Sequence, residues 1–407
     1  MSAGTEGTTA VAARICQYQG LSHLVEKSGL GVAAAHQREM YRQLGAVLTA
    51  RPWRADLIHL NSVFPDAVAL ALLGRALGIP VVMHAHSTEQ DFRDSFRGSN
   101  RLAPLFGRWL RFVYSRGDLV LTPTDYSRDL IESLLAGGGR ARCARGATRP
   151  LPPVRTISNG VDTRFFSPDS DAATRFRARH GLEPDTPVVV SVGHLFVRKG
   201  VLDLVEVARL LPQVRFIWFG HTDRRFLTAD VARAVDSAPP NLLFAGFVDA
   251  AQLRDAYCGA DAFCFLSHEE TEGIVVLEAL ACGTRAVLRD IPIYRQWLGR
   301  SGAATLVADG RGLPARAASA VSAVLAIAGR IPAGARRGMG EGVCADRALA
   351  SPAGLREGAP AGLPTVRDTR EEGLRAARAV DLRATARRLA AILREAGMWP
   401  GEEESRA

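Results

Sequence analysis

The chain has 407 residues, of which 47% are hydrophobic and 23% charged, and it carries a formal net charge of +9. This length and composition are ordinary for a globular protein with two domains, each large enough to bury a core. No uncharged apolar run reaches the roughly 20 residues of a membrane span. The first residues also lack a basic segment followed by an apolar one. We therefore expect a cytoplasmic protein without a signal peptide.

The basic charge suits three kinds of partner: a nucleic acid, an anionic membrane or a phosphorylated substrate. Among the 51 basic residues only Lys27 and Lys199 are lysine. The six cysteines form no CxxC pair, and several lie in apolar runs. They indicate buried thiols in a reducing compartment and argue against both a disulfide framework and a zinc site.

The first part of the chain alternates short apolar runs with helical patterns. Strands are predicted at residues 11–18, 57–60, 80–84 and 118–121, and helices near 32–48, 66–77, 102–115 and 125–134. A Gly-, Arg- and Pro-rich stretch from 136 to 153 is predicted to be a loop or linker. We expect residues 11–153 to form an N-terminal Rossmann-like domain.

A second, clearer series follows the linker. Strands are predicted at residues 187–195, 215–219, 242–247, 262–266 and 285–288, with helices at 201–211, 251–258 and 274–282. This series gives a second Rossmann-like domain at 154–327. Residues 328–372 are predicted to be a disordered insertion, and 373–398 a C-terminal helix. Short apolar strands alternating with helices indicate parallel sheets covered on both faces, and hence an α/β protein whose two domains face a cleft.

Ligands of such sheets gather at the carboxyl ends of the strands. Gly29 and Gly31 open a helix after the first strand, where they would let backbone N–H groups approach a phosphate. A plain helix-entry turn is the alternative, because a single GxG is not the dinucleotide fingerprint. Arg198, Lys199 and Gly200 precede another helix. Cations are disfavoured at a helix N-terminus, so a bound diphosphate explains them better than a solvated basic turn.

Glu270 and Glu278 are eight residues apart. Glu270 precedes a helix that starts near Gly273, and Glu278 lies about two turns into it, so the two carboxylates would hold separate sets of sugar hydroxyls. Glu278 lies within an apolar stretch, where a charge without a partner is costly. Glu269 and Glu272 are interpreted as acids that favour the helix start.

Two histidines, His84 and His86, share one face of a strand end. An HxH pair can form half of a metal site, but no third ligand is evident nearby in the sequence, so we expect no metal.

A basic and aromatic helix is predicted around residues 101–116. Arg101, Arg108 and Arg111 share one face, while Trp109 and several aliphatic residues face elsewhere. Such helices bind anionic membrane interfaces. The alternative is a helix packed on the sheet with a solvated basic face.

Together these residues resemble the retaining glycosyltransferases of family four, which have the two-Rossmann GT-B architecture. Glu270 and Glu278 match the E-x7-E motif of that family, and residues 158–162 resemble the loop that opens its second domain. Residues 84–88, 91–96, 123–127, 198–200 and 289–292 resemble the bacterial 1,2-diacylglycerol 3-glucosyltransferases more narrowly. The resemblance extends over roughly residues 11–300. It implies that the domain at 11–153 binds the acceptor and that the domain at 154–327 binds the nucleotide sugar.

The resemblance implies a role for each matched residue. Glu270 would contact the transferred sugar, Glu278 the ribose, and His86 the sugar or the β-phosphate. Lys199 with Arg198 would neutralise the diphosphate. The remaining donor-binding positions are the glycines Gly29, Gly31 and Gly273.

The family has arginine five residues before this lysine, where this chain has His194. Either Arg198 or a protonated His194 would then supply the missing charge.

The implied function is retaining, metal-independent transfer of a hexose, glucose from UDP-glucose, to a membrane lipid such as diacylglycerol. No cofactor is implied, and the enzyme would lie peripherally on the inner face of the plasma membrane. Other acceptors (phosphoinositol, a soluble sugar or a cell-wall precursor), a sugar-nucleotide epimerase and a non-catalytic sugar-nucleotide-binding protein remain alternatives. A nucleic-acid partner is not expected, because the arginines are spread out and no aromatic-interleaved RNA motif occurs.

Overall fold

The computed structural model describes residues 12–20, 29–95, 98–137, 150–298, 301–331 and 366–399. These residues fall into two compact units. The first runs to Phe165 and also takes in Glu269–Glu278 and the chain from Ala377 onward, and the second consists of Phe166–His268 and Ala279–Ala376. Most of the predicted linker and most of the predicted insertion lie outside the described residues.

The first unit contains a six-stranded sheet in which every pair is parallel, in the order β2-β1-β3-β4-β5-β6. Its central strands are short apolar runs buried on both faces, as parallel sheets require. The strands are β1 (Arg14–Tyr18), β2 (Val47–Leu48), β3 (Leu57–Leu60), β4 (Val81–His84), β5 (Leu119–Thr122) and β6 (Val154–Thr156).

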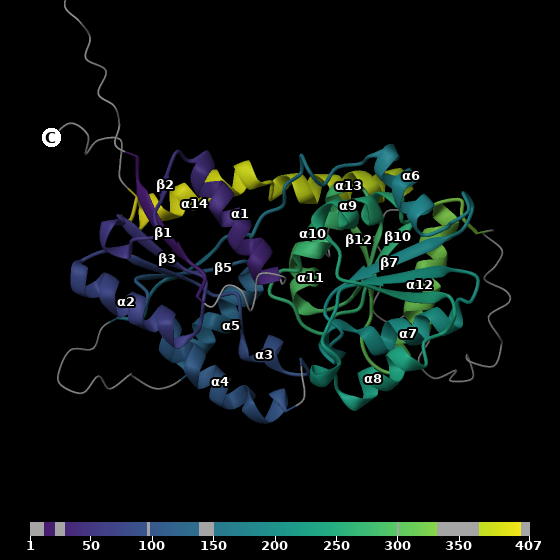
Figure 1. The fold of residues 1–407 in the computed structure, drawn as a ribbon, viewed down its shortest axis with the longest axis horizontal. Coiled ribbons are helices and arrows are strands. Elements are labelled where there is room, and N and C mark those ends of the chain that lie inside the picture. Colours follow the sequence, from purple (N-terminus) through teal and green to yellow (C-terminus); the bar gives the residue numbers. More distant parts are fainter. Residues whose placement is uncertain are drawn as a thin grey trace, which may run out of the picture. The chain divides into compact units, whose positions relative to one another are not determined.

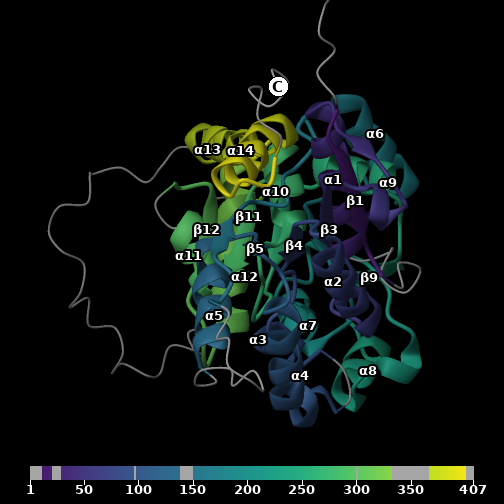
Figure 2. The same cartoon turned by 90° about the vertical axis from the view of Figure 1, so that its left-hand side faces the viewer.

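Helices cover both faces of this sheet (Figures 1 and 2). One core packs α2, α4 and α5 against it, and a second packs α1 and α14. The helical elements of this unit are α1 (Gly29–Gln43), η2 (Pro52–Arg54), α2 (Pro65–Leu77), α3 (Glu89–Phe92), α4 (Ser99–Tyr114), α5 (Asp125–Ala136) and α14 (Leu382–Glu395).

The second unit contains another parallel six-stranded sheet, in the order β12-β11-β10-β7-β8-β9. This is the doubly wound order of the Rossmann fold: the chain moves outward from β7 and then returns to β10 beside it. The strands are β7 (Val188–Val192), β8 (Arg215–Phe219), β9 (Leu242–Gly246), β10 (Ala262–Phe265), β11 (Ala286–Arg289) and β12 (Ala304–Val307).

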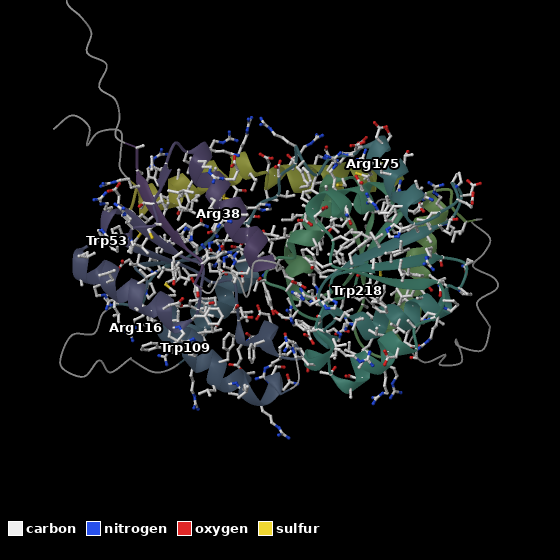
Figure 3. The ribbon with its side chains drawn as sticks, in the orientation of Figure 1. Arg38, Trp53, Trp109, Arg116, Arg175 and Trp218 are labelled. Atoms are coloured by element: carbon white, nitrogen blue, oxygen red, sulfur yellow. The ribbon has the colours of Figure 1, made fainter. Side chains whose placement is uncertain are left out.

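A large core joins α7, α8 and α12 to one face of the second sheet, and it includes Trp218, which is labelled in Figure 3. The helical elements are α6 (Ser170–Arg179), η3 (Val197–Lys199), α7 (Val201–Leu210), η4 (Arg224–Phe226), α8 (Ala229–Asp236), α9 (Ala250–Gly259), α10 (Ile274–Ala281), α11 (Pro292–Trp297), α12 (Leu313–Ile327) and α13 (Val366–Ala379). Helix α10 begins in the segment assigned to the first unit.

The predicted α/β class with two parallel sheets is confirmed. Several local predictions differ from the structure. The helix expected to reach residue 48 ends at Gln43, and Val47–Leu48 instead pairs with β1. The strand β6, just past the expected boundary at 153, belongs to the first sheet. Helix α13 begins at Val366, within the range expected to be disordered.

The C-terminal stretch, predicted as one helix, forms two. The backbone of Val161 exchanges hydrogen bonds with Val380 and Leu382, each at 3.1 Å. Asp381 caps α14 by accepting from the N–H of Arg383 at 2.9 Å. These tertiary contacts take up backbone groups that a continuous helix would have used itself.

Cys16, Cys258, Cys264 and Cys282 form no disulfide among the described residues, and Cys143 and Cys344 lie outside them. Within the described ranges, every helix is too short or too polar to cross a lipid bilayer.

The turn after β8 depends on a glycine. Gly220 has φ +123°, and a methyl group there would lie 2.1 Å from the carbonyl oxygen of Gly193. Gly246 has φ +79° with open space around it.

We expect Gly246→Ala to lower the free energy of unfolding by about 1–2 kcal/mol, because of the left-handed backbone alone. Gly220→Ala should cost at least about 1 kcal/mol more, because the clash adds to the strain. Urea unfolding monitored by circular dichroism measures both, and equal losses would contradict the close approach.

Candidate functional site

The strand order places a ligand position at the carboxyl ends of β7 and β10, the point where the second sheet changes winding direction. The loops that follow these two strands are 193–200 and 266–268, so the cations predicted at 198 and 199 do lie at this point. In the first sheet the winding direction changes between β1 and β3. The start of α1 follows β1 in the chain, and Asn61 directly follows β3.

The loop after β7 rests on the end of β8. The amide of Gly193 donates to the carbonyl of Phe219 at 2.8 Å, and the indole of Trp218 donates to the carbonyl of Gly193 at 2.9 Å. Nδ1 of His194 lies 3.0 Å from the carbonyl of His221, which places the ring proton on Nδ1 and leaves Nε2 as an acceptor.

His194 is poorly placed to act as a cation. Burial lowers the pKa of His194, and the charges of Lys199 and Arg198 lower it further. A neutral imidazole with an acceptor nitrogen does not replace an arginine beside a phosphate. The positive charge expected of this loop therefore rests on Arg198 and Lys199.

The Arg198–Lys199 turn forms the short helix η3, and Gly200 with φ +76° leads from it into α7. The Lys199 side chain packs over Gly193, and its ammonium lies 5.5 Å from the ring centre of Phe265. The carbonyl of Arg198 accepts from the amide of His268 at 2.7 Å and from Oγ of Ser267 at 3.1 Å. The end of β10 thus fixes the conformation of this turn.

In the first unit, α1 begins at Gly29, where open space surrounds the α-carbon, and Gly31, two residues later, is buried. The N-terminus of a helix suits an anion, and the phosphate contact predicted at these glycines stays a prediction.

His86 follows β4 and is fixed by two neighbours. Its Nε2 lies 2.8 Å from Oδ1 of Asn61, and its ring stacks on His84 with centroids 4.1 Å apart. Burial lowers the pKa of His86 to about 3, so the ring is neutral at physiological pH. With Nε2 donating to Asn61, its chemistry is that of a hydrogen-bonding group and not of a cation.

A polar chain lies behind His86. His84 Nδ1 lies 2.7 Å from Nε2 of Gln37 and 3.3 Å from Nε2 of His59, and the hydroxyl of Tyr41 lies 2.7 Å from Nδ1 of His59. Burial lowers the pKa of His59 to about 3 and that of His84 well below its ordinary value. These rings are therefore neutral and serve to hold the strand end rigid.

Glu270 and Glu278 are both buried, with 7% and 4% of their surface exposed, and both belong to the first unit. The segment that carries them is anchored there: Thr124 donates to the carbonyl of Thr271 at 2.9 Å, and Tyr126 donates to the Glu269 carboxylate at 3.3 Å. The donor-binding candidate Gly273 has φ +82°, which lets the chain turn into α10.

Glu272 is more than the helix-start acid expected from the sequence. Only 4% of it is exposed, and its carboxylate accepts from Oγ of Ser158 at 2.5 Å and from the amide of Asn159 at 2.9 Å. His36 of α1 contacts the carbonyls of Asn159 and Gly160 in the same loop. Glu272 thus joins the glutamate segment to the loop at 158–160.

The surface of α4 differs in part from the prediction. Arg101 and Arg108 are exposed, but the indole of Trp109 donates to the carbonyl of Val63 at 2.7 Å and Arg111 donates to that of Leu135 at 3.2 Å. Figure 3 labels Trp109 together with Arg116, whose guanidinium lies 4.3 Å from the ring centre of Phe112. The exposed residues instead form a stripe of alternating character: Arg101, Leu105, Arg108 and Phe112, with Leu102 beside it.

Comparisons with known proteins agree with this geometry. Residues 14–145 match the family model "Glycosyl transferase 4-like domain", and residues 173–327 match "Glycosyl transferases group 1". The chain is 38% identical over 286 residues to the processive diacylglycerol alpha-glucosyltransferase of Acholeplasma laidlawii, covering 70% of this chain and 81% of that enzyme. This chain belongs to the family-four glycosyltransferases.

A further relative and two solved structures extend the comparison. The alpha-galactosylglucosyldiacylglycerol synthase of Streptococcus pneumoniae is 28% identical over 68% of this chain and 72% of its own length. Anabaena HepE, solved with UDP-glucose, shares the fold with a TM-score of 0.63 at 15% identity over 95% of this chain and all of that one. Sucrose-phosphate synthase from Thermosynechococcus elongatus shares it with a TM-score of 0.59 at 18% identity, over 89% of this chain and 77% of that one.

The sequence assigned no site role to several residues of this glycosyltransferase: Asn61, Asp203, Ser267, Phe112 and, beyond that of a helix-start acid, Glu272. Only Glu272 had a usable signal, as an acid beside the paired glutamates. The others become visible through contacts with distant parts of the chain.

The burial of Glu272 makes stability depend on pH. Burial raises the pKa of Glu272 from its ordinary 4.5 to about 7, against the opposing effect of its two hydrogen bonds. The folded state therefore binds this proton more tightly than the unfolded chain. The resulting stabilisation is present at pH 4.5 and is lost as the pH rises to about 7. We expect wild type to lose about 2–3 kcal/mol across this range relative to Glu272→Gln.

Urea unfolding at several pH values measures this difference. Exposed Glu183→Gln is the matched control and should follow wild type. Parallel curves for wild type and Glu272→Gln would contradict the raised pKa.

Proposed function

We propose that this glycosyltransferase moves glucose from UDP-glucose to diacylglycerol in a membrane, with retention of the anomeric configuration and without a metal ion. The observation that carries this proposal is the 38% identity over 81% of a diacylglycerol alpha-glucosyltransferase. The second glycolipid synthase among the relatives supports the lipid acceptor.

The donor roles follow from charge. Lys199 and Arg198 would neutralise the diphosphate as it leaves. Preorganised cations and dipoles meet the developing charge directly, which is why we propose no metal requirement. Glu278 would hold the ribose and Glu270 the transferred sugar, and their burial keeps both carboxylates in fixed positions.

The acceptor is proposed to be reached at the inner face of the plasma membrane. The exposed stripe on α4 combines Arg101 and Arg108 with Leu105, which is 64% exposed, and Phe112, which is 42% exposed. Basic residues attract anionic headgroups, and apolar residues enter the boundary of the acyl chains.

Activity is tested by incubation with UDP-glucose, UDP-galactose or GDP-mannose, each with diacylglycerol micelles and with EDTA. We expect glucosyl-diacylglycerol in the α-configuration by NMR.

Lys199→Met should lower kcat/KM by about 10²–10³, because one stabilising cation is lost. Arg209→Met, an exposed change on the far end of α7, should behave as wild type.

Three results would count against the proposal. Nucleotide release from none of the donors would favour a non-catalytic binding protein. Product formed only with phosphoinositol or a soluble sugar would change the acceptor. Loss of activity in EDTA would refute metal independence.

Membrane binding is tested by co-sedimentation with vesicles. We expect binding to vesicles that contain anionic lipid, and a loss of about tenfold or more in Leu105→Ser/Phe112→Ser, because each exposed apolar side chain contributes about 1 kcal/mol or more on insertion. Phe226→Ser removes an equally exposed apolar residue from the second unit and should bind as wild type. Binding that ignores lipid charge, or that survives the double substitution, would remove the membrane role of α4.

A further inference from the structure

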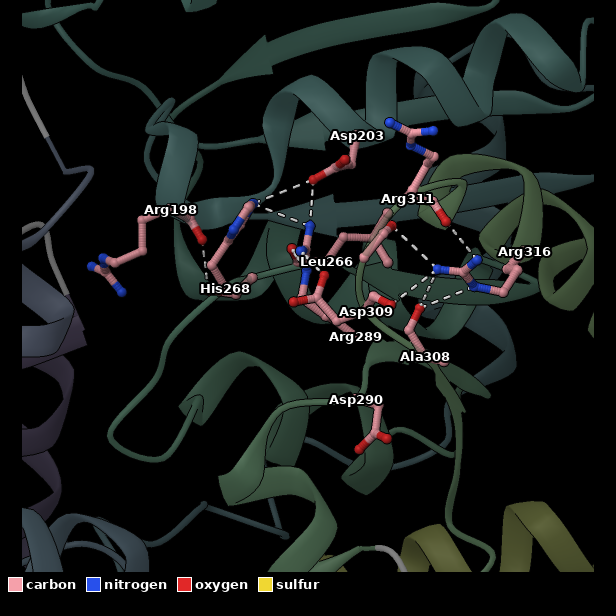
Figure 4. A network of polar contacts seen from close by, with 12 residues as sticks. Arg198, Asp203, Leu266, His268, Arg289, Asp290, Ala308, Asp309, Arg311 and Arg316 are labelled. Carbon is pink, nitrogen blue, oxygen red and sulfur yellow. Dashed lines mark hydrogen bonds and ion pairs between the residues drawn. The ribbon is translucent and has the colours of Figure 1, made fainter. Parts of the chain in front are cut away.

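A buried arginine lies next to the turn formed by Arg198, Lys199 and Gly200 in the second unit, which is called the phosphate turn below. Arg289 ends β11 and is only 3% exposed. Its Nε donates to the carbonyl of Leu266 at 2.9 Å, one terminal nitrogen donates to Asp309 at 2.6 Å, and the other pairs with Asp203 (Figure 4). That last nitrogen also lies 3.1 Å from Nε2 of His268. Each of the three guanidinium nitrogens thus has a hydrogen-bonding partner in the protein.

These contacts exclude Arg289 as a direct ligand of a phosphate, because each of its nitrogens already faces a protein partner. Two carboxylates also offset its charge. A buried charge without such partners would be strongly unfavourable, so the network is held as a unit. Any role of Arg289 in the reaction must act through the residues that it holds.

What Arg289 holds is the end of β10. The carbonyl of Leu266 is also the group that Gly200 approaches: a methyl group on Gly200 would lie 2.2 Å from that oxygen. The next two residues, Ser267 and His268, both donate to the carbonyl of Arg198. Figure 4 shows this carbonyl facing His268 while the Arg198 side chain points away from the network.

Asp203 closes the arrangement, because it lies in the first turn of α7, directly after the phosphate turn. Its carboxylate pairs with Arg289 and lies 3.3 Å from Nε2 of His268. Arg289 therefore ties together the end of β10, the start of α7 and the loop after β12.

We propose that Arg289 is a positioning residue for donor binding: it fixes the end of β10 so that the turn at Arg198, Lys199 and Gly200 presents its cations to a nucleoside diphosphate. This inference rests on the proposed function.

The chain supplies a matched control at the amino-terminal ends of the strands of the same sheet, opposite the phosphate turn. Arg177 pairs with Asp261 at 3.1 Å, and its side chain is 14% exposed. Asp261 in turn accepts from the amide of Val188 at 2.9 Å, at the amino ends of β7 and β10. Arg177→Met therefore removes a comparable buried ion pair without touching the phosphate turn.

The full chain is assayed for UDP binding by calorimetry and for steady-state kinetics with UDP-glucose and diacylglycerol. Lysine cannot reach all three acceptors of Arg289 at once. For Arg289→Lys we expect the Kd of UDP and the KM of UDP-glucose to rise by about 10- to 100-fold. The KM of diacylglycerol should stay within about twofold of the wild-type value, because the substitution leaves the contacts to the acceptor intact. Arg177→Met should lower the unfolding midpoint and leave both donor constants unchanged.

Ser267→Ala keeps the test open if Arg289→Lys does not fold, because it removes one hydrogen bond to the Arg198 carbonyl and should raise the donor constants in the same direction by a few-fold. Donor constants unchanged in the folded Arg289 or Ser267 variants, or equal shifts for donor and acceptor, would overturn the positioning role. If wild type itself binds no UDP, the proposed function fails and this inference fails with it. Wild-type binding with unaltered variants overturns the inference alone.

Discussion

The parallel pairing of every strand in both sheets is the constraint on which the rest of this structure depends. Parallel strands deliver all their carboxyl ends to one edge, so the loops after β7, β10 and β11 must meet there. The phosphate turn, the end of β10 and Arg289 are neighbours for this reason, although they lie far apart in the sequence. The same geometry brings Asn61 and His86 together in the first sheet.

The buried polar groups at these edges are tolerated in two ways. Charged ones are paired, as Arg289 is with Asp203 and Asp309. Histidines are neutral, because burial lowers the pKa values of His59 and His86 to about 3. Positive charge at the turn after β7 is then supplied by Arg198 and Lys199, which suits the proposed donor, whose diphosphate gains negative charge as the sugar is transferred.

Helix α4 shows how one element serves both the fold and a surface. Leu110 and Val113 lie in the core of the first unit. Trp109 and Arg111 donate hydrogen bonds to the backbone carbonyls of Val63 and Leu135, which fixes the helix to its neighbours. The remaining face exposes arginine and apolar side chains in alternation. Because the helix is packed against the core, binding of this face to a membrane, as proposed, would cost little conformational entropy.

Local patterns in the sequence determined nine of the twelve described strands, the longer core helices, the α/β class and the eight-residue spacing of Glu270 and Glu278, since apolar runs and periodicity are properties of neighbouring residues. The strands β2, β6 and β12 were not predicted. Only the tertiary structure decided the rest. Glu272 is buried because Ser158, over a hundred positions away, contacts it. His194 stays neutral because surrounding atoms desolvate it. The C-terminal helix divides because Val161 takes the backbone groups at Val380 and Leu382. In each case the deciding term is burial or a hydrogen bond made by a distant segment, which sequence periodicity does not contain.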